Sequence, residues 1–361
     1  MTVQLENPAT TAHRTVGHNV PKHDGRPLAR GEPVFTDDFT LPGMLYAKVL
    51  RSPHPHARIV RVDKSRALAH PDVVAVLCHE DVKPILHTRA GQSWPEPSPY
   101  DTVVLSRKVR FVGDRVAVVA ARTLVAAEEA LGLIDVEYEV LPALLDKDEA
   151  LRRTDVLIHE EPDPRGIAEG GRTNVAARLD IQVGDVDAAL AAADFVVERS
   201  YDLPRVQASH LEPHVAIAWL DADGRLVVRT STQVPFHLRR ILARVLELPE
   251  ARIRVIKPRV GGGFGDKQEM VLEDLVAVLA LRTGHPVRME FTRAEELIAA
   301  RHRHPQRIVM ATGVMRDGKI VANRMRVLAD TGAYEIVHDA VTAREPAGGI
   351  LQAAALAPSR D

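Results

Sequence analysis

Gly261-Gly262-Gly263-Phe264-Gly265-Asp266-Lys267-Gln268, hereafter the Gly loop, is the stretch of this 361-residue chain that says most about its fold. It follows a strand-like run at 252–257 and precedes a helical stripe of Leu272, Leu275, Val276 and Leu279. Glycine has no Cβ, so such a loop can adopt positive φ and bring backbone N–H groups close to a ligand. Unpaired N–H groups at the start of a helix favour an anion. The stretch therefore predicts a strand-to-helix loop that either binds a ligand or only makes a tight turn.

The Gly loop fits neither of the common nucleotide-binding motifs. A phosphate-binding P-loop requires Gly-Lys-Ser/Thr, whereas here Lys267 follows Asp266 and precedes Gln268. The dinucleotide pattern G-x-G-x-x-G fails because Asp266 stands at its sixth position. A different ligand, or none, has to be considered for the loop.

Composition limits the classes of protein to which the chain can belong. Its length predicts two or three domains, each large enough for its own core. A hydrophobic content of 45% and a charged content of 27% are ordinary for a globular protein. A formal charge of −2 leaves no basic excess for nucleic-acid phosphates, and 4% aromatic residues leave few stacking platforms.

The single cysteine, Cys78, excludes an intrachain disulfide, a cysteine-ligated iron–sulfur cluster and a cysteine-rich zinc site in this chain. It lies in the apolar run 73–78 and is predicted to be a buried small hydrophobe. Residues 1–20 show no apolar targeting core, and no window is apolar enough for a membrane span. We therefore expect a cytoplasmic protein.

Hydrophobic periodicity predicts an α+β fold. Helices are expected where apolar residues recur at helical spacing, and strands where they alternate or run continuously. Hairpins with Asp-Gly turns interrupt the alternation of strands and helices, which disfavours a doubly wound sheet. The predicted strands are 45–50, 73–78, 115–120, 134–140, 195–201, 215–220, 226–230, 286–291, 307–312 and 320–330, and the predicted helices include 124–133, 186–193 and 234–246.

Three further groups of polar residues are candidates for chemistry. Gln233, between a predicted strand and a helix, can donate to an oxo group or a carbonyl, or can serve as a polar cap. The run 301–304, Arg-His-Arg-His, is predicted to be a solvated or salt-bridged segment, because its arginines disfavour a metal cation. His210 and His214 flank Glu212-Pro213, and the proline disrupts a regular metal-binding helix.

Two groups of short segments carry a resemblance to a known family. The first comprises LPGMLYA at 41–47, RSPH at 51–54, HARI at 56–59 and VGDRVA at 112–117. The second comprises LEPH at 211–214, STQVP at 231–235, the Gly loop, GHPVR at 284–288 and DTGAY at 330–334. In this order they resemble the molybdenum-binding large subunit of the xanthine dehydrogenase, aldehyde oxidase and aerobic carbon monoxide dehydrogenase family, over residues 25 to 335.

The resemblance implies a domain organisation. A flexible N-terminal arm, 1–25, would precede an a/b hammerhead domain at 26–145 and a linker at 146–175. The first molybdopterin-binding domain would follow at 176–345, incomplete, with a divergent tail at 346–361.

The resemblance also assigns roles to residues. Gln233 matches the glutamine that hydrogen-bonds the molybdenum oxo group, and Gly262, Gly263, Phe264 and Gly265 match the loop that contacts the cofactor. The cofactor would be a molybdenum–molybdopterin, with the cytosine dinucleotide form as one alternative. Its dithiolene holds the metal, so no protein side chain is expected to be a direct metal ligand. [2Fe-2S] clusters and FAD would lie on partner subunits, a small and a medium one.

Two departures from the family pattern shape the expected function. Purine-oxidising members carry a glutamate where this chain has the substrate-pocket candidate Gln268, so the substrate, an aldehyde or an N-heterocycle, stays open. After Tyr334 the likeness fades, and a second molybdopterin domain with the general-base glutamate is missing. No catalytic residue is therefore expected in this chain, which we predict to be truncated and inactive by itself. The alternative is a non-catalytic module that docks the iron–sulfur and flavin subunits.

Overall fold

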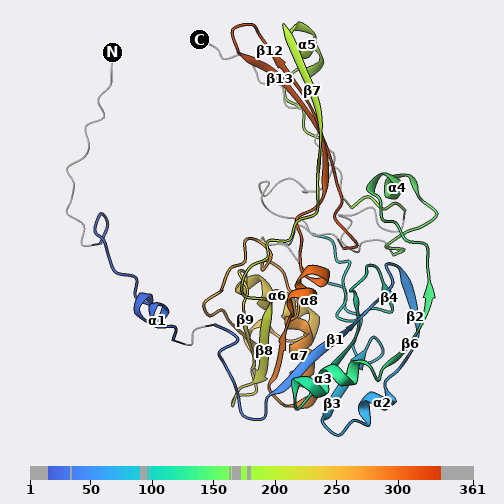
Figure 1. The fold of residues 1–361 in the computed structure, drawn as a ribbon, viewed down its shortest axis with the longest axis vertical. Helices are drawn as coiled ribbons and strands as arrows, with labels where there is room; N and C mark the ends of the chain where they lie inside the picture. Colours follow the sequence, from blue (N-terminus) through green and yellow to red (C-terminus); the bar gives the residue numbers. More distant parts are fainter. Residues whose placement is uncertain are drawn as a thin grey trace.

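The computed structural model describes residues 15–32, 35–89, 96, 98–161, 164, 172–176 and 180–334. The predicted tail at 346–361 and most of the predicted N-terminal arm lie outside these residues. Helix α1 spans Gly25–Ala29, before the main body of the chain begins (Figure 1).

A seven-stranded mixed sheet, in the order β10-β9-β8-β11-β1-β5-β3, forms the centre of the body (Figure 1). Its strands are β1 (Leu45–Arg51), β3 (Val73–Cys78), β5 (Arg115–Ala121), β8 (Val215–Leu220), β9 (Leu226–Thr230), β10 (Ile253–Ile256) and β11 (Val287–Glu290). Strand β1 pairs with β11 in parallel and with β5 in antiparallel orientation. The sheet therefore takes strands from both sides of the predicted linker.

Helices cover both faces of this sheet because the strands alternate their side chains. Val118 and Ala120 of β5 belong to the large core under α6 (Pro235–Leu246) and α7 (Glu273–Thr283). Ala117 and Val119 point to the other face and pack with residues of α2 (Ser65–Leu68) and α3 (Leu124–Leu131). The large core draws on both predicted domains, whereas the smaller clusters lie within the first of them.

Two smaller sheets complete the fold. One has the order β4-β2-β6, from Lys108–Val109, Ala57–Asp63 and Asp135–Val140. The other has the order β13-β12-β7, from Ile320–Ala329, Gln306–Val314 and Phe195–Leu203, and carries α5 (Val186–Ala192). This second sheet projects from the body as a long arm (Figure 1). The remaining helices are α4 (Lys147–Arg152), α8 (Arg293–Ala299) and the short 3₁₀ helix Glu250–Arg252.

The α+β expectation is confirmed, as are the predicted strands, and several helices begin with side-chain caps. Asp185 caps α5, and Thr292 with Glu295 forms a reciprocal capping box at α8. One local expectation is wrong, because α7 begins at Glu273, five residues beyond the Gly loop. The loop amides are therefore not the first turn of that helix. Helix α7 is also not amphipathic with a charged, exposed face, since even its Glu273 and Asp274 are buried.

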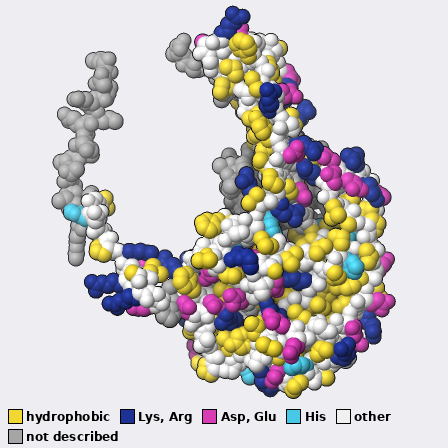
Figure 2. Space-filling model, viewed as in Figure 1, with side chains coloured by type: hydrophobic (Ala, Val, Ile, Leu, Met, Phe, Trp, Pro, Cys, Tyr) yellow, Lys and Arg dark blue, Asp and Glu magenta, His cyan; other side chains and the backbone are white. Residues whose placement is uncertain are grey.

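The distribution of surface charge and the burial of Cys78 agree with what the composition predicts. Figure 2 shows basic and acidic side chains interspersed over the body, without a large region of one sign on this face. Cys78 is buried and free, and burial raises the pKa of its thiol. Within the described residues, no helix combines the length and apolar character that crossing a bilayer requires.

Candidate functional site

The Gly loop has the irregular backbone that its glycines predict. Gly262 and Gly265 both adopt φ of +98°, in the region that glycine enters without a steric cost. Phe264 between them has φ of +51°, which is uncommon for a residue with a side chain, and that side chain is 77% exposed. The loop therefore presents an aromatic ring outward on a sharply folded backbone.

Gln233 lies against this loop and is fixed by it. It follows β9 and immediately precedes the N-cap of α6, and its backbone N–H donates to the Lys267 carbonyl at 2.8 Å. Its side-chain Oε1 accepts from the backbone N–H groups of Gly265 at 3.2 Å and Lys267 at 3.4 Å. Since these donors require the oxygen on this side, the Nε2 end of the amide is left to donate elsewhere.

The close approach of Gln233 explains why position 263 is a glycine. A Cβ on Gly263 would lie 2.4 Å from Gln233 Oε1, a distance that real Cβ contacts do not show. The structure thus brings together the predicted residues Gln233, Gly263 and Gly265. Gln268 is half-buried at the end of the same loop.

Lys267 is committed to the protein and is not presented to a ligand. Its side chain is fully buried, and its Nζ donates to Glu212 Oε2 at 2.7 Å. The same oxygen accepts from the Gly261 backbone N–H at 2.7 Å. Burial lowers the pKa of Lys267, and the charge and hydrogen bond of Glu212 oppose that shift. Residues 210–214, hereafter the brace, therefore contact the Gly loop through Glu212 and support it.

Two histidines of this brace meet a buried glutamate. His210, His214 and Glu296 place ligand-type atoms within 4.8 Å of one another. The sequence pattern did not predict this, because Pro213 rules out a helical pair and Glu296 lies 82 residues from His214 on α8. Only the fold brings the three groups together.

The charged run at 301–304 is salt-bridged, as predicted. Arg301 pairs with Glu269 at 2.5 Å, and both side chains are buried. Burial raises the pKa of Glu269 even though Arg301 lowers it. His302 lies 3.0 Å from the Leu297 carbonyl through Nε2, and burial lowers the pKa of His304.

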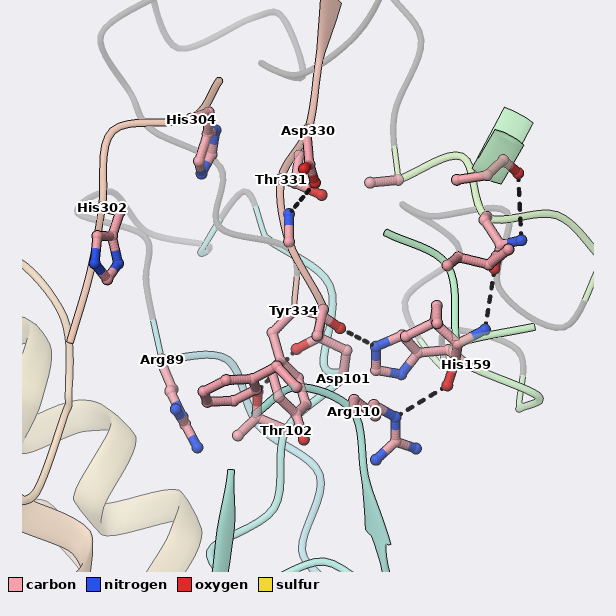
Figure 3. A pocket seen from close by; sticks show the side chains of 18 of the residues that line it. Arg89, Asp101, Thr102, Arg110, His159, His302, His304, Asp330, Thr331 and Tyr334 are labelled. Atoms are coloured by element: carbon pink, nitrogen blue, oxygen red, sulfur yellow. Dashed lines mark hydrogen bonds between the residues drawn. The ribbon is translucent and has the colours of Figure 1, made fainter. Parts of the chain in front are cut away.

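A cavity of about 910 Å³ lies elsewhere, between the body and the base of the arm. Figure 3 shows Arg89 and Arg110 beside Tyr334, with His302 and His304 on another wall. Neither Gln233 nor any residue of the Gly loop lines it, whereas the run 301–304 does. Several of its polar groups are already engaged within the protein, for example His159 with the Ala333 carbonyl at 2.7 Å. The Gly loop, where a donor remains available, is therefore the stronger candidate site.

Three large exposed apolar side chains belong to the Gly loop or to segments next to it in the fold. Leu211 of the brace is 90% exposed, Phe236 in the first turn of α6 is 76% exposed, and Phe264 projects from the loop itself. Each belongs to a segment that contacts the loop or carries Gln233. Clustered exposed apolar residues mark surfaces that bind a ligand or further protein.

Comparisons with known proteins agree with this picture. A family description of a molybdopterin cofactor-binding domain matches residues 167–348, and one of the aldehyde oxidase and xanthine dehydrogenase a/b hammerhead domain matches residues 30–142. The chain belongs to the aldehyde oxidase and xanthine dehydrogenase family. The expected hammerhead fold followed by a molybdopterin-binding domain is thereby confirmed.

Relatives within the family differ in the share of their length that is matched. The probable hypoxanthine oxidase XdhD of Escherichia coli K12 is 39% identical, over 88% of this chain but 36% of that protein. The nicotinate dehydrogenase large molybdopterin subunit of Eubacterium barkeri is 35% identical, over 92% of this chain and 74% of that subunit. The structure of quinoline 2-oxidoreductase from Pseudomonas putida 86 gives a TM-score of 0.76 at 33% identity, over 87% of this chain and 39% of the other. The chain thus spans little more than a third of most of these relatives.

Proposed function

We propose that this chain supplies the Gln233 and Gly-loop face of a molybdenum cofactor site in an enzyme that hydroxylates aldehydes or N-heterocycles with oxygen from water. The observation that carries the proposal is the fixed amide of Gln233. Its Oε1 accepts from two backbone N–H groups, so the orientation of the amide is fixed and Nε2 is left as the donor. Membership of a molybdopterin-binding family supports an oxygen of the molybdenum centre as the acceptor.

The residues present fit such a group without any protein ligand to the metal. When bound, the cofactor supplies the redox chemistry, because its dithiolene rather than the protein holds the molybdenum. Gln233 would orient an oxygen atom through Nε2. Gly262 and Gly265 would allow close approach of the backbone, and Phe264 would exclude water from that side. The general base is not assigned among the described residues.

The proposed substrate class rests on position 268 and on the relatives. Gln268 is a neutral amide, which can bind a heterocycle without the charge of a glutamate. Relatives named as a probable hypoxanthine oxidase, a nicotinate dehydrogenase and a nicotine 6-hydroxylase have names that refer to N-heterocycles. We place N-heterocycles ahead of aldehydes for this chain.

Electron transfer is proposed to lie on other polypeptides. Relatives named as a large subunit or a large chain imply assemblies, and partners with iron–sulfur clusters and FAD would accept the electrons. The exposure of Leu211, Phe236 and Phe264, on the loop or on segments next to it, supports coverage of this part of the surface by further protein. The cytosine dinucleotide form of the cofactor is part of the same proposal.

The test is to purify the tagged chain with whatever subunits accompany it from a host that makes the cofactor. Molybdenum content and dye-linked oxidation of nicotinate, quinoline and an aldehyde are then measured. Gln233→Ala removes one donor, so we expect turnover to fall by about 10- to 100-fold while molybdenum is retained. The exposed Gln182→Ala serves as the control and should match the wild type. An assembly without molybdenum, or a Gln233→Ala variant with wild-type turnover, contradicts the proposal.

A further inference from the structure

We propose that His210, His214 and Glu296 form a binding site for a divalent transition metal, of which zinc is the best fit. The site is separate from the molybdenum cofactor and lies behind the Gly loop. All three residues are buried, with exposures of 1%, 2% and 0%. It does not depend on the proposed hydroxylase function.

The tautomers of both histidines follow from their outer hydrogen bonds. His210 Nδ1 lies 2.6 Å from the Glu212 carbonyl, and His214 Nε2 lies 3.2 Å from the Asp266 carbonyl. A carbonyl only accepts, so each of these ring nitrogens carries the proton. The other nitrogens, His210 Nε2 and His214 Nδ1, are then lone pairs in the neutral rings. This is the pattern of metal-binding histidines, whose second nitrogen donates to a carbonyl or a carboxylate.

Both lone pairs face the carboxylate of Glu296. His214 Nδ1 lies 2.9 and 3.0 Å from its two oxygens, and His210 Nε2 lies 3.7 Å from Oε2. An ionised carboxylate cannot donate a hydrogen bond, so three electron-rich groups converge with nothing positive between them. His210 Nε2 has no hydrogen-bond partner, although its side chain is fully buried. A cation bound between the three groups would give all of them a partner and would remove their mutual repulsion.

The donor set selects the kind of cation. Two imidazole nitrogens and one carboxylate suit zinc and similar transition metals, whereas calcium and magnesium prefer oxygen ligands. Zinc binds nitrogen and oxygen at about 2.0–2.2 Å, so ligand atoms in a tetrahedral site lie about 3.3–3.6 Å apart. The Glu296 oxygens lie 2.9 to 3.7 Å from the two histidine nitrogens, close to that spacing, and all three ligand atoms lie within 4.8 Å of one another. Rotation of the side chains toward a shared centre would complete the site.

The surroundings support the ligands. The backbone N–H of His214 donates to Glu296 Oε1, which orients the carboxylate. The nearby charge of Lys267 is matched by Glu212 at 2.7 Å. His214 also holds the Asp266 carbonyl of the Gly loop, so a metal here would tie α8, the brace and the loop together.

The alternative to a bound metal is a proton on His214 Nδ1, because the resulting imidazolium would also pair with the Glu296 carboxylate. The test distinguishes the two. The chain is stripped with a chelator, reconstituted with zinc at pH 7.5, and dialysed, and its zinc is measured by mass spectrometry. We expect about one zinc per chain, and cobalt in its place should give d–d absorption typical of nitrogen and oxygen ligands.

Two variants locate the site, and one controls for other histidines. Glu296→Gln and His210→Ala should each weaken zinc binding by at least about 100-fold, because even outer-shell changes cost 10- to 100-fold. His302→Ala, outside the cluster, should leave it unchanged. Circular dichroism reports whether each variant folds. A wild-type chain that retains no zinc after reconstitution overturns the proposal irrespective of the variants, as does unchanged zinc affinity in a folded Glu296→Gln variant.

Discussion

Single atoms decide the geometry of the candidate site, and Gly263 is the clearest case. Its φ is not in the left-handed region, so an alanine would be tolerated by the backbone. The obstacle is instead Gln233 Oε1, which a Cβ would approach to 2.4 Å. Gly263→Ala should therefore displace the amide and destabilise the protein by about 1–3 kcal/mol. Urea unfolding, with the midpoint and slope compared, measures this.

A double-mutant cycle separates the clash from a general effect of alanine. In a Gln233→Ala background the obstructing atom is gone, so Gly263→Ala should cost much less. Gly132→Ala is a matched control, because this glycine has an ordinary right-handed conformation and its Cβ would meet nothing closer than 3.5 Å. Equal costs of Gly263→Ala in both backgrounds would show that Gln233 is not the constraint.

At the scale of elements, a buried ion pair joins β5 to α7. Arg115 donates to both carboxylate oxygens of Asp274, at 2.5 and 3.1 Å, and also to the Val104 carbonyl. Asp274→Asn leaves the arginine charge buried without its partner. We expect a loss of about 3–5 kcal/mol in the free energy of unfolding, measured in urea at pH 7. The exposed pair of Arg153 with Asp155 is the control, and Asp155→Asn should change little.

The same pair predicts a dependence of stability on pH. Burial alone would raise the pKa of Asp274, but the charge and hydrogen bonds of Arg115 outweigh it and hold the pKa below its ordinary value. A carboxyl whose pKa is lower in the folded state stabilises the fold above its unfolded pKa of about 3.9. This contribution is lost as the pH falls below that value. Asp274→Asn should remove this part of the acid sensitivity, and an unchanged acid profile would contradict the role.

How far the sequence predicts each element depends on whether its signal is local. The strand at 73–78 and the capping box at Thr292 are encoded by neighbouring residues, and both are present. The place of β1 between β11 and β5 depends on pairing over more than two hundred residues, which no local pattern carries. The start of α7 carries no local sequence signal, since its N-cap Leu272 makes no side-chain cap, and the buried Glu273 instead accepts from the Val271 and Leu272 amides.

The candidate site shows the same division. Glycine content and the position of Gln233 mark the loop, because backbone freedom and a polar residue at a strand end are local features. The cluster of His210, His214 and Glu296 could not be predicted, since α8 supplies its third member. Long-range packing therefore places the chemistry that spacing cannot reveal.

The whole molecule depends on a core that its two halves share. Leu45, Ala47 and Val49 of β1 pack in the same cluster as Leu275 and Leu279 of α7. Strand β1 also pairs with β11, so separating the halves exposes an unpaired strand edge and apolar surface on each. The halves are therefore expected to fold as one cooperative unit rather than as independent domains.

Expressing the two halves apart tests this cooperativity. Residues 26–145 and 176–334, made separately, should each lack a cooperative thermal transition and should aggregate, because the main core is divided between them. Made together, they should associate, since the sheet can re-form between β1 and β11. Size-exclusion chromatography and circular dichroism distinguish these outcomes. If 26–145 alone melts cooperatively at the midpoint of the whole chain, the shared core is not what stabilises this half. Its smaller clusters around Val76 and Ile59 would then be sufficient for folding.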